Sequence, residues 1–361
     1  MTSNRFRPQY GFSRGRNRII HMILSETILP YRMLNTWKPE IFHGRRKKKN
    51  FFEGWYFKIV DRSEKHAYAV IPGVSLPENP SNSHAFVMFL DARAQRMRYF
   101  RYPLNEFSAS DKKFELTIGG SFFSLDEMRL NLMHGGDPVT ARMNFKDIYP
   151  WPVKLLSPGV MGWYAFVPRM ECYHGILSMD HSIEGFIEAD GIRTDLKGGR
   201  GYIEKDWGTS MPSSWIWMQT NHFDQEGISL SGSIAKIPWL GSYFTGYIFG
   251  FLYEKKLYRF TTYSGAKVTE LDVTRDNIHI RLESKAYILD IDADRSEGVE
   301  LPAPRLGEMT AKVKESLHSS INVTLLRKKG SCMEHIYSGT GRNSGLEFVG
   351  EIAELIKGLK K

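Results

Sequence analysis

The chain has 361 residues, and chains beyond roughly 250–300 residues tend to divide into domains, so we expect two. Its formal net charge of +9 is confined to the start of the chain: residues 1–50 hold 12 Lys and Arg against 2 Asp and Glu, whereas the remainder holds 37 against 38. Nucleic-acid-binding proteins carry their positive charge as a patch on the folded body. The composition therefore argues against a nucleic-acid partner.

The N-terminal segment has an unusual composition. Residues 1–25 contain five Arg and no acidic residue, as organelle-targeting peptides do. The alternative is that Met33 starts the protein and that residues 1–32 are a disordered or spurious extension. In either case we assign residues 1–36 to a basic extension outside the folded body. The run Arg45–Lys49 could make peripheral contact with anionic lipid headgroups, or it could be an ordinary solvated charge run.

Other features limit the compartment and the chemistry. Two cysteines, Cys172 and Cys332, are too few for a disulfide framework, and no stretch reaches the roughly 18–20 apolar residues that span a bilayer. These features indicate a soluble protein of a reducing compartment, and we expect it in the cytoplasm. The 11 His show no HxH or HExxH spacing and no phosphate-binding glycine loop occurs, so we expect no metal and no nucleotide.

From about Asn50 onward, short apolar or alternating runs are separated by turn residues, a pattern typical of antiparallel sandwiches and barrels. In the segment Phe114–Leu125, alternating apolar residues on both sides of Gly119-Gly120 predict a hairpin. Similar turns are expected at 186–191, 223–227 and 273–277. Two similar β-barrels in tandem would satisfy this pattern, because closure removes exposed sheet edges.

Three segments near the C-terminus depart from the strand pattern. Leu306–Leu317 could form a helix or an ordered loop, and apolar residues at helical spacing predict a short helix within Leu346–Leu355. The segment Asp294–Pro304 is rich in charge, Pro and Gly, so it is expected to be a long surface loop.

The first candidate site lies in the predicted strand Phe51–Lys58. Because side chains alternate along a strand, Glu53 shares one face with Trp55 and Phe57, whereas Tyr56 lies on the other. A carboxyl group buried among aromatic residues has a raised pKa and can stay a neutral acid near pH 7. The alternatives are an ion pair with Lys or Arg, or exposure at a strand end.

The densest cluster joins Gly201–Gly208 to the strand-like run Trp215–His222. One face of the second run carries Trp215, Trp217, Gln219 and Asn221. A face of Trp with amides suits the wall of an apolar cavity that contains a few orienting polar groups, or else a plug that closes the end of a barrel. A further segment, Pro168–Gly175, contains His174, which could be a buried structural histidine or part of the site.

These clusters resemble the hallmarks of the tocopherol cyclase family. The resemblance rests on Phe52–Lys58, on Glu204–Gly208 with the run from Trp215 to Asn221, and on Ser182–Glu188, which precedes the second hallmark. It extends from about Trp37 to the C-terminus, with the order and separation of the motifs kept.

The resemblance implies two tandem antiparallel β-barrels related to calycins and lipocalins, in residues 37–211 and 212–361, with a short C-terminal helix. It also implies cofactor-free chemistry on a prenylated phenol or another isoprenoid lipid: an acid protonates an alkene and a ring closes onto the resulting cation, or water adds to it. The expected acids are Glu204, Asp206 and Glu53. The residues expected to bind substrate are Trp55, Tyr56, Trp207, Trp215, Trp217, Gln219, Asn221 and His174. The alternative is a carrier of the lipocalin type, which needs the same pocket but no proton donor.

Overall fold

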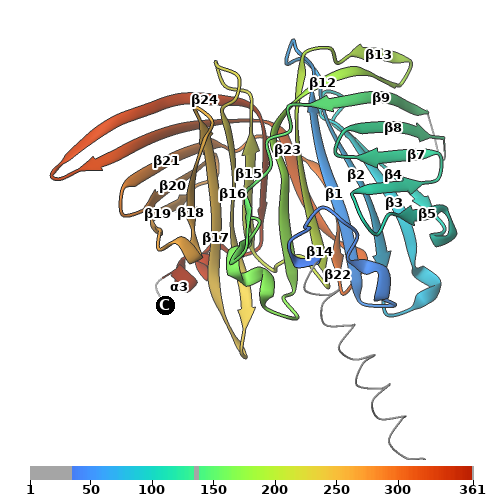
Figure 1. The fold of residues 1–361 in the computed structure, drawn as a ribbon, viewed down its shortest axis with the longest axis horizontal. Coiled ribbons are helices and arrows are strands. Elements are labelled where there is room, and N and C mark those ends of the chain that lie inside the picture. Colours follow the sequence, from blue (N-terminus) through green and yellow to red (C-terminus); the bar gives the residue numbers. More distant parts are fainter. Residues whose placement is uncertain (1–34, 134–137, 360–361) are drawn as a thin grey trace, which may run out of the picture.

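The computed structural model describes residues 35–133 and 138–359. Within these residues the chain consists almost entirely of β-strands, which form two large antiparallel sheets side by side (Figure 1). The predicted all-β class is therefore confirmed. The possible start at Met33 and nearly all of the basic extension lie outside the described residues.

The first sheet has 12 strands from the N-terminal half of the chain. They are β1 (Phe51–Val60), β2 (Ala67–Leu76), β3 (His84–Asp91), β4 (Arg96–Tyr102), β5 (Phe107–Ala109), β6 (Glu115–Ile118), β7 (Ser121–Ser124), β8 (Glu127–Leu132), β9 (Val139–Lys146), β12 (Cys172–Ala189), β13 (Ile192–Asp195) and β14 (Gly199–Gly208). Their order is β4-β3-β2-β1-β14-β12-β9-β8-β7-β6-β5, and β13 pairs with β12. The turn between β6 and β7 is the one expected at Gly119-Gly120.

The second sheet has 10 strands. They are β15 (Trp215–Thr220), β16 (Ser229–Trp239), β17 (Ser242–Tyr253), β18 (Lys256–Thr261), β19 (Lys267–Val273), β20 (Asn277–Glu283), β21 (Tyr287–Asp294), β22 (Val299–Arg305), β23 (Glu308–Lys329) and β24 (Cys332–Val349). Their order is β18-β17-β16-β15-β24-β23-β21-β20-β19, and β22 pairs with β23. Helix α3 (Ile352–Leu359) follows, as predicted near the C-terminus.

Small elements complete the fold. A two-stranded ribbon joins β10 (Val153–Lys154) to β11 (Ser157–Pro158), and the short 3-10 helices are η1 (Gly44–Arg46), η2 (Pro80–Asn82), η3 (Leu104–Glu106), η4 (Gly162–Phe166) and η5 (Thr262–Ser264). Among the described residues, no helix has the length and apolar character needed to traverse a bilayer.

The two halves repeat one topology. In each, the first strand lies between the second and the last strand: β1 between β2 and β14, and β15 between β16 and β24. In the part of the chain that the structure describes, the end strands of each sheet do not pair with one another, so the barrels are not closed. Residues 209–214 connect the sheets, and the division into domains 37–211 and 212–361 stays a prediction.

The three C-terminal segments differ from their expected structures. Leu306–Leu317 is the turn and first part of β23, not a helix, and the expected surface loop Asp294–Pro304 contains most of β22. Residues 346–349 continue β24, and helix starts only at Ile352. Pairing with neighbouring strands overrides the local pattern here, because β23 bonds to β21, β22 and β24 along its length.

The turn between β22 and β23 docks on the first sheet. The amide of Gly307 donates to the carbonyl of Thr209 (2.7 Å), and the hydroxyl of Ser75 donates to the carbonyl of Gly307 (2.7 Å). Gly307 has φ 77°, and a Cβ there would lie 2.5 Å from both the carbonyl oxygen of Leu76 and the amide nitrogen of Phe51. Only glycine fits this approach of two backbones, so the hairpin ties the sheets together.

Three hydrophobic clusters follow from the alternation of side chains. Trp55 and Phe57 point into the core of the first sheet, and Ile216 and Met218 into that of the second. The opposite faces of the same strands form a third cluster between the sheets, which includes Tyr56, Tyr202, Trp215 and Trp217.

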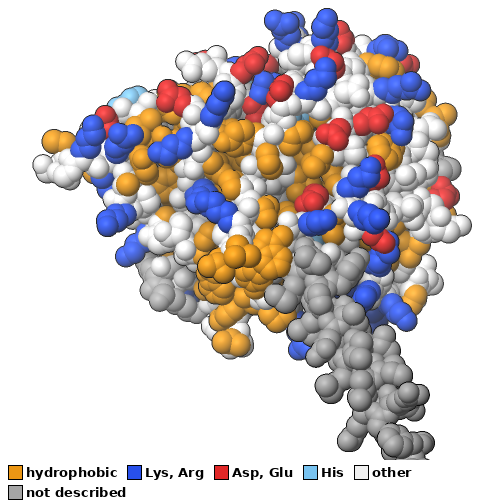
Figure 2. Space-filling view, in the orientation of Figure 1, with side chains coloured by type: hydrophobic (Ala, Val, Ile, Leu, Met, Phe, Trp, Pro, Cys, Tyr) orange, Lys and Arg blue, Asp and Glu red, His pale blue; other side chains and the backbone are white. Residues whose placement is uncertain are grey.

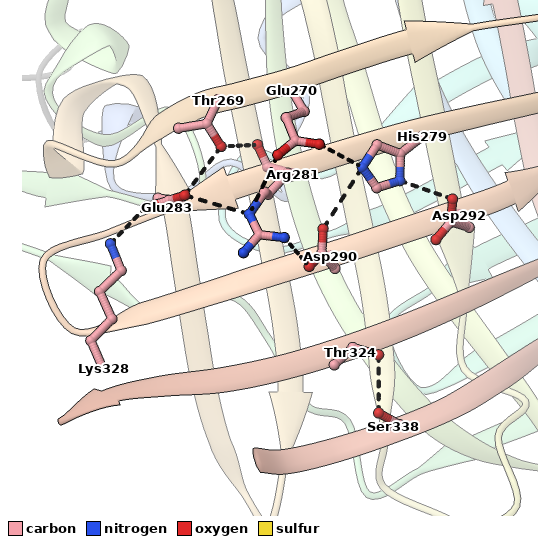
Figure 3. Close-up of polar contacts among 10 residues, drawn as sticks. All are labelled: Thr269, Glu270, His279, Arg281, Glu283, Asp290, Asp292, Thr324, Lys328 and Ser338. Carbon is pink, nitrogen blue, oxygen red and sulfur yellow. Dashed lines mark hydrogen bonds and ion pairs between the residues drawn. The ribbon is translucent and has the colours of Figure 1, made fainter. Parts of the chain in front are cut away.

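The outer face of the second sheet is polar (Figure 3). Along β20, Ile280 is fully buried, whereas its neighbours His279 and Arg281 point outward and pair with Asp292 (2.9 Å) and Asp290 (2.7 Å) on β21. This is the alternation expected for one face on a core and one in solvent.

The docked turn gives a test of the link between the sheets. We expect Gly307→Ala to lower the free energy of unfolding by roughly 2–5 kcal/mol, since it adds a clash with rigid backbone to the strain of a positive φ. The matched control is Gly330→Ala in the turn between β23 and β24, where φ is 61° and no atom lies within 4 Å of the added Cβ. That control is expected to cost only the backbone strain, roughly 1–2 kcal/mol. Denaturant unfolding of both variants measures the difference, and equal losses would contradict the docking role.

Candidate active site

A cavity of about 200 Å³ lies between the two sheets. Its lining is largely apolar, with Phe, Met, Ile, Leu and Pro side chains from both sheets and from β22. Its histidine and acidic side chains gather with a tyrosine beside two indoles, and a few Ser, Thr, Cys and other Tyr side chains also line the cavity. The members of this polar group are Tyr56, His174, Glu204, Asp206, Glu315 and Glu347, beside Trp215 and Trp217. An apolar cavity wall with a few polar side chains that point to one place is the usual form of a ligand site.

Strand register places the acids in one row. Tyr56 on β1 pairs with Glu204 on β14, and on the facing sheet Glu347 on β24 pairs with both Trp217 on β15 and Glu315 on β23. Paired residues of antiparallel strands point to the same face. The pairing therefore brings three glutamates from three strands to one cavity.

Two hydrogen bonds cross between the sheets at this point. The Tyr56 hydroxyl of the first sheet donates to Oε1 of Glu315 in the second. In the opposite direction, Nε1 of Trp217 donates to Oε2 of Glu204 (3.0 Å). The rings of Tyr56 and Trp217 meet edge to face at 5.4 Å between centroids. These contacts close one end of the cavity.

Glu315 and Glu347 are the carboxyl groups of the cavity that are best suited to donate a proton. Burial, with the nearby Glu204 charge, raises the pKa of Glu315 to about 8. Burial, followed by the Glu315 charge, raises the pKa of Glu347 well above its usual value of 4.5, although Nε1 of Trp215 donates to its carboxylate (2.7 Å). Oε2 of Glu315 is buried and has no hydrogen-bond partner among the described residues. At neutral pH, therefore, Glu315 holds a proton and has a free oxygen, and burial favours the protonated form of Glu347 as well.

Glu204 is better suited to the ionised form. Besides Trp217, the hydroxyl of Tyr202 donates to its Oε2 (2.5 Å), and Nε2 of His174 lies 3.7 Å away. Burial raises the pKa of Glu204, and His174 opposes this, leaving it at about 7. Hydrogen bonds and a cation thus keep this carboxylate available as a base.

His174 lies between two carboxylates. Its Nδ1 is 3.0 Å from Oδ1 of Asp206, and its Nε2 faces Glu204. Burial alone would lower the pKa of His174, but the charges of Asp206 and then Glu204 outweigh burial and raise it to about 9. The imidazole is therefore a cation at neutral pH.

The same three side chains, His174, Glu204 and Asp206, have ligand atoms within 4.8 Å of one another and could hold a divalent cation by distance alone. Their donor set of one imidazole and two carboxylates suits such an ion. A metal ligand must be neutral imidazole, so a bound cation would have to displace the proton that Asp206 and Glu204 favour on His174. Without a cation, the three side chains form an ion-paired triad.

Five of the residues expected in the site lie outside the cavity, among them Glu53, Trp55 and Trp207. Glu53 is fully buried against Lys205 (2.5 Å), and its oxygens accept from the amide of His43 (2.9 and 3.0 Å). Burial would raise the pKa of Glu53, but Lys205 and His43 outweigh it and lower the pKa. Trp55 packs in the first core, and Trp207 stacks on His43 at 4.4 Å. Glu53 is therefore the partner of a buried lysine, which is one of the alternatives that the sequence left open.

The expected amides lie on the correct face of β15 but past the end of the cavity. Oε1 of Gln219 accepts from the ammonium of Lys58 (2.8 Å), and Nδ2 of Asn221 donates to Asp180 (3.0 Å). Burial lowers the pKa of Lys58 to about 7. These residues form a polar cluster between the sheets, apart from the apolar lining.

Sequence reasoning missed Tyr202, Glu315 and Glu347. The two glutamates lie in segments expected to be helical or irregular. As a strand, 313–317 puts Val313, Glu315 and Leu317 on one face, and a carboxylate on an apolar face of a strand is the signal that marked Glu53. Because this segment was not expected to be a strand, Glu315 was not recognised as a candidate acid.

The Glu53–Lys205 pair gives a test of a structural role. We expect Glu53→Gln to lower the free energy of unfolding by about 3–5 kcal/mol, because it leaves a buried ammonium without its counter-ion. The double variant Glu53→Gln/Lys205→Met should recover part of this loss in denaturant titrations. A single variant as stable as wild type would contradict the structural role.

The raised pKa of Glu315 predicts a pH dependence of stability. Between the usual carboxyl pKa of 4.5 and about 8, the folded protein holds a proton on Glu315 that the unfolded chain releases. Stability from this group is therefore complete below the unfolded pKa and is lost as the pH rises through about 8. We expect the free energy of unfolding to fall from pH 5 to pH 9, and to fall less in Glu315→Gln. Parallel curves for the two proteins would show that Glu315 keeps no proton.

Comparisons with known proteins agree with this fold and motif content. A family model described as tocopherol cyclase-like matches residues 133–350, which is more than half of the chain. A chloroplastic tocopherol cyclase of Zea mays is 24% identical over 86% of this chain and 77% of that protein, and a probable chloroplastic tocopherol cyclase of Oryza sativa subsp. japonica is 26% identical with the same coverage. The crystal structure of CghA with Sch210972 superposes with a TM-score of 0.52 at 9% identity, covering 83% of this chain and 89% of that one, a similarity of fold alone. The chain belongs to the tocopherol cyclase-like family.

Proposed function

We propose that the cavity between the sheets catalyses an acid-promoted cyclisation of a prenylated phenol or related isoprenoid lipid. The observation that carries the proposal is the protonated Glu315 carboxyl, whose free Oε2 lies buried beside Glu347 and two indoles in an otherwise apolar cavity. Membership of the tocopherol cyclase-like family and the names of the plant relatives support a cyclase.

The proton donor is Glu315 or its strand neighbour Glu347. The acid transfers its proton to one carbon of a substrate alkene, and a tertiary cation forms at the other carbon. An acid that is neutral at the working pH can do this without a metal. The faces of Trp215, Trp217 and Tyr56 lie beside the cavity, and each contributes about 0.5–2 kcal/mol of cation–π stabilisation.

Glu204 acts as the base, and proton exchange with solvent after product release returns the donor to its acid form and Glu204 to its carboxylate. The phenolic oxygen attacks the tertiary cation to form the C–O bond, and its O–H proton passes to the carboxylate of Glu204. The cationic His174, which Asp206 holds in place, lowers the pKa of Glu204 against the effect of burial and so favours the carboxylate before the step. The product is an isomer of the substrate, so no oxidant or cofactor enters the balance. If water replaces the phenol as the nucleophile, the same groups perform a hydration.

Three variants test the assignment: Glu315→Gln, Glu347→Gln and Glu204→Gln. We expect the variant that removes the donor, and Glu204→Gln, each to lower the turnover of a prenylated hydroquinone by roughly 100-fold or more. The control is Glu184→Gln, an exposed glutamate on β12 whose partner is Lys146. Chromatography separates the cyclised isomer, and a hydrated product is recognised by its added mass.

The pH profile of turnover should report the same groups. The rate is expected to rise with pH as Glu204 ionises near 7 and to fall above about 8 as Glu315 loses its proton. If wild type binds the hydroquinone and returns it unchanged after long incubation, the protein is a carrier and the catalytic proposal is wrong. Full activity in all three glutamine variants would also rule out these residues as acid and base.

A further inference from the structure

An exposed apolar rim surrounds one side of the cavity. It consists of Leu155 (76% exposed), Leu156 (79%), Trp163 (46%), Phe166 (41%) and Leu240 (92%). Figure 2 shows hydrophobic side chains gathered on the lower part of this face, where Figure 1 places η4 and the end of the β16–β17 hairpin. Exposed apolar patches of this kind mark an interaction surface.

Ring contacts join the rim into one surface. Trp37 donates from Nε1 to the carbonyl of Leu155 (3.0 Å) and packs on Phe166 at 5.3 Å between centroids. Trp163 stacks on Tyr164 at 4.0 Å, and Tyr164 in turn contacts Trp239 next to Leu240. The apolar residues are therefore neighbours rather than scattered exceptions.

The rim continues into the cavity. The segments that carry it also supply Met161, Tyr164, Ile237 and Phe244 to the cavity lining. Apolar side chains therefore extend from this surface to the cavity.

The charge of the rim is of one sign. Residues 150–170 and 236–246 contain Lys154, Arg169 and Lys236 but no Asp or Glu. Lys154 and Arg169 are exposed, whereas Lys236 pairs with Glu354 (2.8 Å). Trp, Phe and Leu flanked by Lys and Arg are the composition of surfaces that lie in a membrane interface. Basic residues near such a surface attract anionic headgroups.

We propose that this rim docks the protein on an anionic lipid surface, so that a hydrophobic ligand enters the cavity from the lipid phase without crossing water. The nature of that ligand rests on the proposed function, but the docking itself does not. The surface differs from the basic run Arg45–Lys49, where Arg45 pairs with Asp111 and Lys49 with Glu78.

The experiment is vesicle flotation of the full chain with phosphatidylcholine alone or with one-third phosphatidylglycerol. Wild type should float with the anionic vesicles, and more weakly at high salt. The variant Leu155→Ser/Leu156→Ser/Leu240→Ser should bind at least roughly tenfold more weakly, because three side chains lose their apolar contact with the lipid. The control is Ile192→Ser/Met333→Ser, which removes apolar side chains of 57% and 54% exposure at other places and should bind as wild type does.

Other occupants of the rim give different results. Undiminished flotation of the serine variant, or a loss seen only in Lys47→Ser/Lys48→Ser, would overturn the proposal. The proposal would also be overturned if wild type bound neither kind of vesicle but formed a dimer, and if the serine variant did not form that dimer. A second copy of the chain would then cover the rim.

A short-tailed, water-soluble prenylphenol separates docking from catalysis. None of the three leucines lines the cavity, so the serine variant should turn over this substrate as wild type does and lose only turnover of vesicle-borne substrate. If wild type floats through the rim but converts neither substrate, the proposed function fails and the docking stands.

Discussion

Two hydrogen bonds that cross between the sheets in opposite directions hold the site together: Tyr56 to Glu315, and Trp217 to Glu204. Each uses a side chain of one sheet to satisfy a buried carboxyl of the other. The same contact excludes water, and the loss of water raises the pKa of these carboxyls. The contacts that join the sheets are therefore also the cause of the raised pKa values of Glu315 and Glu204. A change that separates the sheets would also lower these pKa values.

Another connection between the sheets works without charge. The turn at Gly307 bonds to Thr209 in the linker and to Ser75 on β2, and it brings β22 over the cavity. The segment expected to be a surface loop thus supplies apolar lining. On the other face of β1, the buried pair of Glu53 and Lys205 joins β1 to β14 within the first sheet. Lys205 also donates to the carbonyls of Pro39 and Ile41.

The sequence correctly predicted which side chains share a face where this depends only on the alternation within one strand. The alternation of Glu53 and Trp55 against Tyr56, and of Trp215 and Trp217 against Ile216, is found in the structure. It did not reveal which face meets the cavity, because that depends on how two sheets face each other. Glu315 and Glu347 were missed for a related reason. Glu347 pairs with Trp217 on β15, Glu315 pairs with Glu347, and no local pattern contains the pairing of strands so far apart in the chain.

Few residues of the site belong to the hydrophobic core of either sheet. Its walls come from the third hydrophobic cluster, whereas the two barrel-like cores are made by the opposite faces of the same strands. Lining residues such as Met211 and Ile237 pack against the third cluster and belong to neither core. Mutations that reshape the ligand's surroundings can therefore accumulate without eroding foldability, which lets one scaffold diversify its chemistry while its architecture stays constant.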